Sequence, residues 1–195
     1  DLVLAGAMSS NQGDTFTHAT AAANAYTTAF ISRATAVGGN TTITLDGGEA
    51  QRFIAQEWSG LTFDATAGVG TASATTTVTP ATPNASTVAD SVSFSSLVIS
   101  AGGSYATQAI ATGFTESGRS TPAEPGQFVG GYRVETTTGV KSAAWVDPGI
   151  YPDERAALIL VFSGAGGGSL EGAAGMATGA AVMAAQGSQN TTGQA

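Results

Sequence analysis

FISRATAVGGNTTITLDGGEAQRFIAQEWSG, residues 30–60, and GGYRVETTTGVKSAAWVDPGIYPDERAALILVFSG, residues 130–164, are two versions of one pattern. Each has a strand-like stretch with an arginine, a glycine turn, a second strand rich in Thr or Ala, and an apolar strand that ends in Ser-Gly. The positions that coincide are Arg33 and Arg133, Gly39 and Gly139, Leu45 and Trp145, Arg52 and Arg155, and Ser59-Gly60 and Ser163-Gly164. This repeat predicts an all-β fold, a β-sandwich made of two similar halves.

The repeat extends outward from these two stretches. The apolar run 2–8 is answered by residues 92–100, so the halves are expected at about 1–63 and 90–164. Residues 64–90 contain Pro80 and Pro83 and are expected to form the crossover or an edge, because proline cannot donate to a β-ladder. The run from Ala156 to Phe162 is apolar on both faces, which predicts a central strand covered on both sides.

The core predicted from these strands consists of their large apolar residues. They are Phe30, Ile43, Phe53, Ile54, Trp58, Leu97, Ile99, Tyr132, Trp145, Leu158, Leu160 and Phe162.

Composition excludes several classes of function. Only 10% of the 195 residues are charged, against about 25% in ordinary domains, and hydroxyl-bearing and small residues replace them. The net charge is −8, Lys141 is the only lysine, and the five arginines are scattered, which excludes a nucleic-acid or anionic-membrane surface. No apolar stretch reaches about 18 residues, so membrane insertion is not expected. The absence of cysteine excludes disulfides and Cys-ligated zinc.

The two ends of the chain carry their own expectations. The chain opens on Asp1 rather than Met, inside a strand-like run, and is expected to have lost upstream residues by processing or trimming. Residues 165–195 are a Gly/Ala-rich tail or linker in which 176–186 favour a helix. Because the tail has little apolar area, any ordering is expected to come from contact with another chain. The candidate subunit-contact residues are Gly175, Met176, Gly179, Val182 and Met183.

Candidate catalytic sets are weak, and the sequence predicts a protein that is not an enzyme and has no cofactor. His18 is the only histidine and lies in no nucleophile-elbow motif. The acidic pair Asp153-Glu154, and Asp46 with Glu49, fall in turns and are interpreted as solvated charge rather than as the facing carboxylates of a glycosidase. A calcium site that uses Asp46, Glu49 or Asp14 stays open.

Two further sets have both a structural and a ligand-binding reading. Trp58 and Trp145 could form a sugar-stacking platform, but their partners in the repeat are plain apolar residues, which favours core packing. The repeated arginines are interpreted as members of edge ion pairs rather than as a carboxylate-binding fork. Their expected partners are Glu57, Glu135 and Glu154.

The order of these segments resembles a jelly-roll-type β-sandwich module of bacteriophage virion proteins and bacterial surface proteins. The first half carries the resemblance in DLVLAGAM (1–8), GDTFT (13–17), GGNTTITL (38–45) and EWSG (57–60). The second half continues it in SLVIS (96–100), TGFTESGR (112–119), YRVETTTG (132–139), SAAWV (142–146) and AALILVFSG (156–164).

The resemblance implies a structural, non-enzymatic role in a virion, as head decoration, head fibre or tail component. The implied partners are further copies of the chain and other virion proteins. The alternative is a carbohydrate-binding or adhesion module at a cell surface, with a glycan as ligand.

Overall fold

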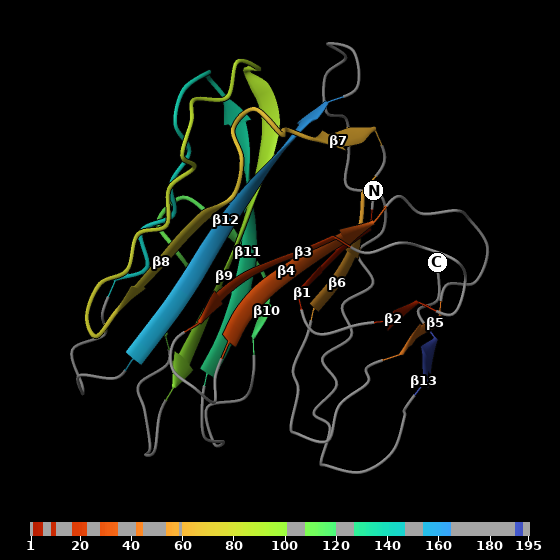
Figure 1. Cartoon of the computed structure of the whole chain (residues 1–195), viewed down its shortest axis with the longest axis vertical. Helices are drawn as coiled ribbons and strands as arrows, with labels where there is room; N and C mark the ends of the chain where they lie inside the picture. Colours follow the sequence, from red (N-terminus) through yellow and green to blue (C-terminus); the bar gives the residue numbers. More distant parts are fainter. Residues whose placement is uncertain are drawn as a thin grey trace.

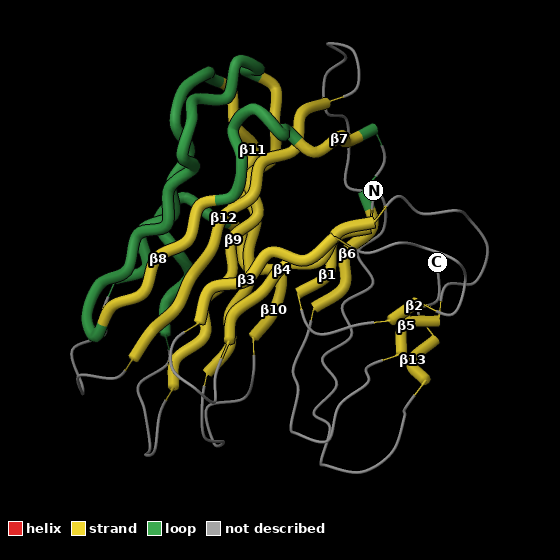
Figure 2. Tube along the Cα trace, viewed as in Figure 1, coloured by secondary structure: helices red, strands yellow, loops and turns green. Residues whose placement is uncertain are grey.

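The computed structural model describes residues 2–5, 9–10, 17–22, 28–34, 42–44, 54–58, 60–100, 108–119, 127–146, 154–164 and 190–192. Within these residues every regular element is a β-strand, every strand pair is antiparallel, and there is no helix (Figures 1 and 2). The predicted all-β class is confirmed for this part of the chain.

The first sheet has the strand order β3-β4-β1-β6. Its strands are β1 (Leu2–Ala5), β3 (Thr17–Ala22), β4 (Thr28–Ala34) and β6 (Ile54–Glu57). Short strands of this kind, separated by Gly, Asn and Asp clusters, are what the period-2 pattern of the sequence favours. All four come from the first 57 residues.

The second sheet has the order β10-β11-β9-β12-β7, and β8 also pairs with β12. Its strands are β7 (Leu61–Phe63), β8 (Gly70–Ala74), β9 (Asp90–Ser100), β10 (Thr115–Arg119), β11 (Gln127–Thr136) and β12 (Glu154–Gly164). β9, β11 and β12 are the long strands, and they lie side by side (Figure 1).

The two sheets share a strand order. In the first, β4 lies between β3 and β1, and β6 follows β1; in the second, β11 lies between β10 and β9, and β12 follows β9. The sequence aligns Arg33 with Arg133, and these residues lie on the corresponding strands β4 and β11. In this alignment, however, equivalent residues lie on different faces of the two strands. The β4 positions that face the core between the sheets are odd-numbered, Ala29 and Ile31, whereas the β11 position packed against it is Tyr132. An alignment that places core-facing residues of β4 on core-facing residues of β11 therefore differs by one residue from the alignment that places Arg33 on Arg133.

A core lies between the two sheets, and we call it the inter-sheet core. From the first sheet it takes the smaller side chains, Ala21, Ala29 and Ile31. From the second it takes large ones, among them Phe94, Leu160 and Phe162. β3 and β4 lie across β9 and β12 in Figure 1 and contact them. The aromatic rings meet edge to face: the Phe94 and Phe162 centroids are 5.4 Å apart with the ring planes at 88°.

The opposite face of the second sheet carries another core, which we call the outer core. Strand residues such as Leu97, Val129 and Ile159 pack there against Val78 and Trp145. Val78 and Trp145 belong to two irregular segments, 78–86 and 139–145, which we call the cover segments. Isolated bridges pair Val78 with Trp145, Ala81 with Ser142 and Ser86 with Gly139. β12 is thus covered on both sides, as predicted, and Ala156 to Phe162 are at most 1% exposed.

Several sequence-based element boundaries are wrong. Residues 64–90 were expected to be the crossover or an edge. They contain β8, an edge strand that pairs with β12, and one cover segment, and β7 also pairs with β12, so they are not a crossover. Val78, Ser142 and Trp145 pair in isolated bridges and not in a ladder. The two cover segments are rich in Thr, Ala and Pro, so apart from Trp145 no large apolar residue indicated their burial.

The predicted core residues are mostly found where expected. Leu97, Ile99, Trp145, Leu158, Leu160 and Phe162 are buried, while Trp58 and Tyr132 are half-buried and pack against the inter-sheet core. Phe30, Ile43 and Ile54 lie in strands, but only their backbone is described, and Phe53 lies outside the described residues.

A third, small sheet joins β2 (Ser9–Ser10), β5 (Thr42–Thr44) and β13 (Asn190–Thr192) in the order β13-β5-β2. β13 lies in the C-terminal tail, and its partner β5 belongs to the same chain. The expectation that the tail orders only against another chain is therefore wrong for 190–192. A ladder bonds through backbone groups, so it needs no apolar side chains from the tail. The expected helix at 176–186 lies outside the described residues.

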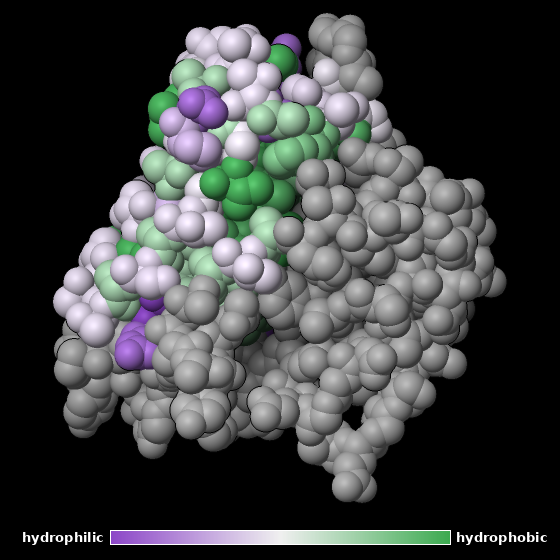
Figure 3. All heavy atoms as spheres, in the orientation of Figure 1, coloured by the Kyte–Doolittle hydropathy of each residue, from purple (hydrophilic) through white to green (hydrophobic). Residues whose placement is uncertain are grey.

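The described surface has little strong polarity. Figure 3 shows it as mainly pale, with small, separate strongly hydrophilic areas and an apolar area near the middle of the visible face. This agrees with a composition in which only 10% of residues are charged.

Candidate functional site

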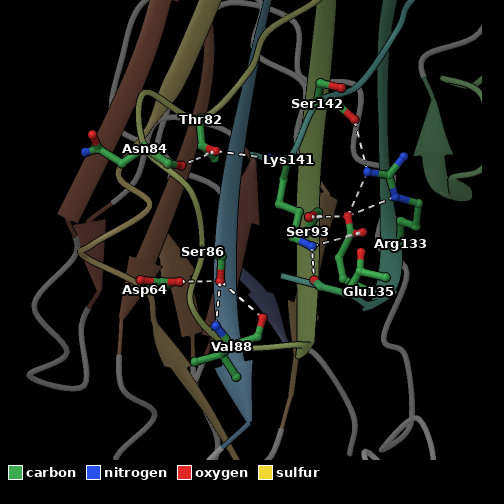
Figure 4. Close-up of polar contacts among 11 residues, drawn as sticks. Asp64, Thr82, Asn84, Ser86, Val88, Ser93, Arg133, Glu135, Lys141 and Ser142 are labelled. Atoms are coloured by element: carbon green, nitrogen blue, oxygen red, sulfur yellow. Dashed lines mark hydrogen bonds and ion pairs between the residues drawn. The ribbon is translucent and has the colours of Figure 1, made fainter. Parts of the chain in front are cut away.

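Two polar clusters, each with a buried carboxylate, lie beside the second sheet, where the cover segments meet it (Figure 4). We name them after their carboxylates. The Glu135 cluster consists of Ser93, Arg133, Glu135 and Lys141, and the Asp64 cluster of Asp64, Asn84 and Ser86.

Glu135 is 8% exposed; its carboxylate accepts two hydrogen bonds and also faces a lysine ammonium group. The Ser93 hydroxyl on β9 donates to Oε1 at 2.6 Å, and Arg133 Nε on β11 donates to the same oxygen at 2.9 Å. The Lys141 ammonium lies 3.7 Å from Oε2. Ser93 and Glu135 are in this position because β9 and β11 pair with Arg133 opposite Ser93 and Glu135 opposite Ser91.

Lys141 is 3% exposed, and its ammonium also donates to the Thr137 carbonyl. The Arg133 guanidinium donates from Nη2 to the Ser142 carbonyl at 3.1 Å and lies 4.7 Å from the centroid of the Phe114 ring. Both cations therefore connect the carboxylate on β11 to backbone carbonyls of residues 137–142. The predicted ion pair of Arg133 with Glu135 is confirmed.

Asp64 begins a turn between β7 and β8. Its Oδ1 accepts the backbone N–H groups of Thr66 at 3.0 Å and Ala67 at 3.1 Å, the pattern of an Asx turn. Its Oδ2 accepts the Ser86 hydroxyl at 2.7 Å. Gly68, with φ +75°, completes the turn and donates its N–H to the Asp64 carbonyl.

The Asp64 turn is bonded to the first cover segment at further points. The Asn84 side-chain amide donates to the Thr66 carbonyl at 3.1 Å. Ser86 and Gly139 exchange two backbone hydrogen bonds of 2.9 and 2.8 Å, and Gly139 has φ +114°, a conformation that favours glycine.

Thr82 connects the two clusters. Its hydroxyl accepts the Lys141 backbone N–H at 3.1 Å and donates to the Asn84 carbonyl at 2.8 Å, while its own N–H donates to the Lys141 carbonyl at 2.9 Å. Thr82 is 3% exposed. Because buried polar groups are costly without partners, this chain of bonds fixes the cover segments relative to β11 and β7.

These clusters direct their donors at carboxylates and carbonyls of the same chain. Ser93 has no exposed surface, and its hydroxyl donates to Glu135 rather than to a solvent-facing group. As arranged, the groups hold segments together. Among the residues that the structure describes, no group of three or more His, Cys, Asp or Glu residues could hold a metal ion.

A more exposed ion pair lies on the edge strand β10. Arg119 Nε donates to Glu116 Oε1 at 2.7 Å, and Arg119 Nη1 donates to the Gln108 carbonyl at 2.7 Å. The hydrogen bond from Arg119 lowers the pKa of Glu116 below its ordinary value, against the opposing effect of partial burial. A bulge between Glu116 and Gly118 breaks the regular ladder there, which makes this edge a poor template for another strand.

The two candidate sugar-binding tryptophans differ. Trp145 has no exposed surface, and its indole N–H donates to the Ser95 hydroxyl at 3.0 Å, so it is a core residue, as the sequence favoured. Trp58 is half-buried, and its ring meets Tyr132 and Phe94 edge to face at 4.9 and 5.4 Å. The structure does not bring the two indoles into one site, because Trp58 packs on the inter-sheet core and Trp145 in the outer core.

Other sequence candidates are placed only in part. His18 and Arg33 lie in β3 and β4, where only their backbone is described. Arg155 is buried in β12, and Glu154 begins that strand in an exposed position. The remaining candidates lie outside the described residues: Asp14, Asp46, Glu49, Arg52, Asp153, and the tail residues Gly175, Met176, Gly179, Val182 and Met183.

Sequence reasoning missed most of the polar clusters. An aspartate directly after a strand and four residues before a glycine is a turn signal that could have found Asp64 and Gly68. The sequence around Ser93 and Lys141 contains no such signal, because their contacts with Glu135 depend on which distant segments lie side by side in the fold.

Among the described residues, none belongs to a helix long and apolar enough to cross a membrane. Comparisons with protein-family models, curated protein sequences and solved structures find no match.

Proposed function

We propose that the chain is a rigid structural component of a phage or phage-like particle, acting through subunit contacts as head decoration, head fibre or tail component. We further propose that it is a jelly-roll-like β-sandwich of two similar halves. The shared strand order of β3-β4-β1-β6 and β10-β11-β9-β12 supports the second statement. The resemblance of the sequence to virion modules supports the first.

The observation that carries the structural role is the use of the polar groups in the Glu135 and Asp64 clusters. Arg133, Lys141 and Ser86 bond to carboxylates and backbone carbonyls of their own chain. Strand β12 is buried on both faces, and the cover segments are held by such bonds, which makes this part of the fold rigid. A rigid module suits a protein that must present a fixed surface to neighbouring subunits.

The particle assignment is tested by localisation. Particles purified from cells that carry the gene should contain the chain in a fixed stoichiometry. Immunogold labelling with an antibody against it should mark one part of the particle: head surface, fibre or tail. If the chain stays in the soluble fraction while intact particles lack it, the assignment is wrong.

An adhesion or carbohydrate-binding role is the alternative, and Trp58 is its one favourable feature because its ring is only half-buried. A glycan array with the full chain discriminates the two roles. Saturable binding that is lost in Trp58→Ala and kept in Trp145→Phe, a core control, would favour adhesion. Absence of binding in all three proteins leaves the particle role as the better account.

A further inference from the structure

The two large sheets are segregated along the chain. Every strand of the first sheet lies within residues 2–57, and every strand of the second lies within residues 61–164. Among the described residues, the chain passes from one sheet to the other once, between β6 and β7. The boundary between the sheets is therefore at 58–60, not in the expected crossover at 64–90.

The contact between the sheets is apolar. No ladder pair joins a strand of the first sheet to one of the second among the described residues. The first sheet contributes the smaller residues, Ala21, Ala29 and Ile31, which pack over the large residues of β9 and β12. Separating the two large sheets would expose apolar surface on both but would leave the ladders within each of them intact. The ladder between β5 and β13 joins residues 42–44 to 190–192, so it would have to be exchanged together with the first sheet.

The connection between the sheets is short and contains a glycine with a positive φ. β6 ends at Glu57 and β7 begins at Leu61. Between them, Gly60 has φ +70°, and a Cβ placed on it would meet nothing within 4 Å. Gly60 lies directly before β7, so a change in its φ would change the direction from which the preceding chain enters the second sheet.

We propose that the first sheet is an exchangeable element and that its second binding partner is another copy of this chain. In the closed monomer it packs on its own inter-sheet core. In a reciprocal dimer it packs on the same face of the partner copy through identical apolar contacts, with Gly60 extended in both chains. Exchange of an identical element is a low-cost route to dimers, because the interface already exists.

The connection permits this exchange. Glycine adopts positive and negative φ at similar cost, so Gly60 can be left-handed in the closed monomer and extended in the dimer, and the apolar face that each copy uncovers is covered again by the other copy. The proposal goes beyond the structural role proposed above and does not depend on a particle. The form of self-association is the reciprocal exchange of the first sheet between two copies.

The first test uses Gly60 in the full chain. Gly60→Ala adds no clash, but it disfavours the left-handed conformation of each closed monomer about five-fold or more. Because the dimer releases two such residues, its association constant should rise about 25-fold. Gly60→Asn is the matched control, because asparagine tolerates this conformation and should shift the ratio far less. All three proteins are refolded from denaturant at one concentration, and light scattering after size exclusion gives the dimer-to-monomer ratio.

A second test separates exchange from contact between closed monomers. Ile31→Asp damages the first sheet's side of the inter-sheet core, and Leu160→Asp damages the second sheet's side. Neither full-length variant should fold alone. Refolded together, they should form a mixed dimer in which the sound first sheet of one chain packs on the sound second sheet of the other. Native mass spectrometry identifies this species.

A Gly60→Ala ratio equal to that of the wild type, or the absence of a mixed dimer, overturns the proposal. If Gly60→Ala fails to refold, the mixed-dimer experiment decides alone. These outcomes differ from failure of the particle role, because a strictly monomeric chain can still be found on particles, and an exchanging chain can be absent from them.

Discussion

The two faces of the second sheet are covered in different ways. On the inter-sheet face, Phe94 and Phe162 meet edge to face and the covering layer is another sheet. On the outer face, the covering layer is two irregular segments, joined to each other by isolated bridges. Lys141 forms an ion pair with buried Glu135, and Ser86 donates a hydrogen bond to buried Asp64. One face is stabilised mainly by buried apolar area. The other also needs every polar partner in place, so single substitutions should affect the two faces differently.

The largest effect is expected on the inter-sheet face. Phe162 is fully buried, and its ring contacts Phe94 and Phe63. Phe162→Ala should lower the free energy of unfolding by about 3–5 kcal/mol, measured by urea denaturation, because it removes apolar area and leaves a cavity. Val134→Ala, at a position that is 52% exposed, is the control and should change it by less than about 0.5 kcal/mol. A loss below about 1 kcal/mol in Phe162→Ala would mean that the aromatic contacts do not carry this face.

On the outer face, the Glu135 cluster should give the next largest effect. Glu135→Ala leaves the Lys141 ammonium buried without its carboxylate, which should cost about 3 kcal/mol. The double variant Glu135→Leu/Lys141→Met replaces the pair by apolar groups and should recover part of this loss. Urea denaturation of Glu135→Leu, Lys141→Met and the double variant gives the coupling energy. Strictly additive losses would show that Glu135 and Lys141 do not act as a pair.

A smaller effect is expected at Asp64. Asp64→Ala removes the acceptor for two backbone amides and for the Ser86 hydroxyl and should cost about 1–3 kcal/mol. Amide hydrogen exchange should accelerate at Thr66 and Ala67 and hardly change along β12. Asp64→Asn keeps one carbonyl oxygen as an acceptor and should lie between the two proteins. Equal exchange rates in Asp64→Ala and the wild type would contradict the assigned turn.

The smallest effect is a pH dependence at the edge of the sheet. The pKa of Glu116 is lowered in the folded chain by its bond to Arg119, so the pair stabilises the fold above the ordinary pKa of 4.5. That contribution is lost as the pH falls through the lowered value. The pair is partly exposed, so Glu116→Gln should cost less than about 1 kcal/mol at neutral pH. Thermal unfolding at decreasing pH should show the two proteins converging in acid; a constant difference would contradict the pair's role.

The sequence predicted the strands of the second sheet better than the two segments that cover its outer face. The apolar run from Ala156 to Phe162 marks a strand buried on both sides, because only apolar residues tolerate burial without partners. Val78 and Ser86 gave no comparable signal, since their burial depends on bridges to Trp145 and Gly139, far away in the chain.

The candidate site shows the same limit. The pairing of Arg133 with Glu135 was predictable because residues two apart on a strand share a face. The contribution of Lys141 was not, because it enters from a segment without strand periodicity. The packing of the tryptophans against the apolar cores was predictable only through the repeat, in which their partners are apolar residues.

The burial of Lys141 has a practical consequence. It is the only lysine in the sequence, and in the fold its side chain is 3% exposed. Acylating reagents that modify lysine side chains can therefore reach Lys141 only when residues 137–142 separate from β11. The rate of lysine acylation thus measures how often this part of the outer face opens, without any engineered label.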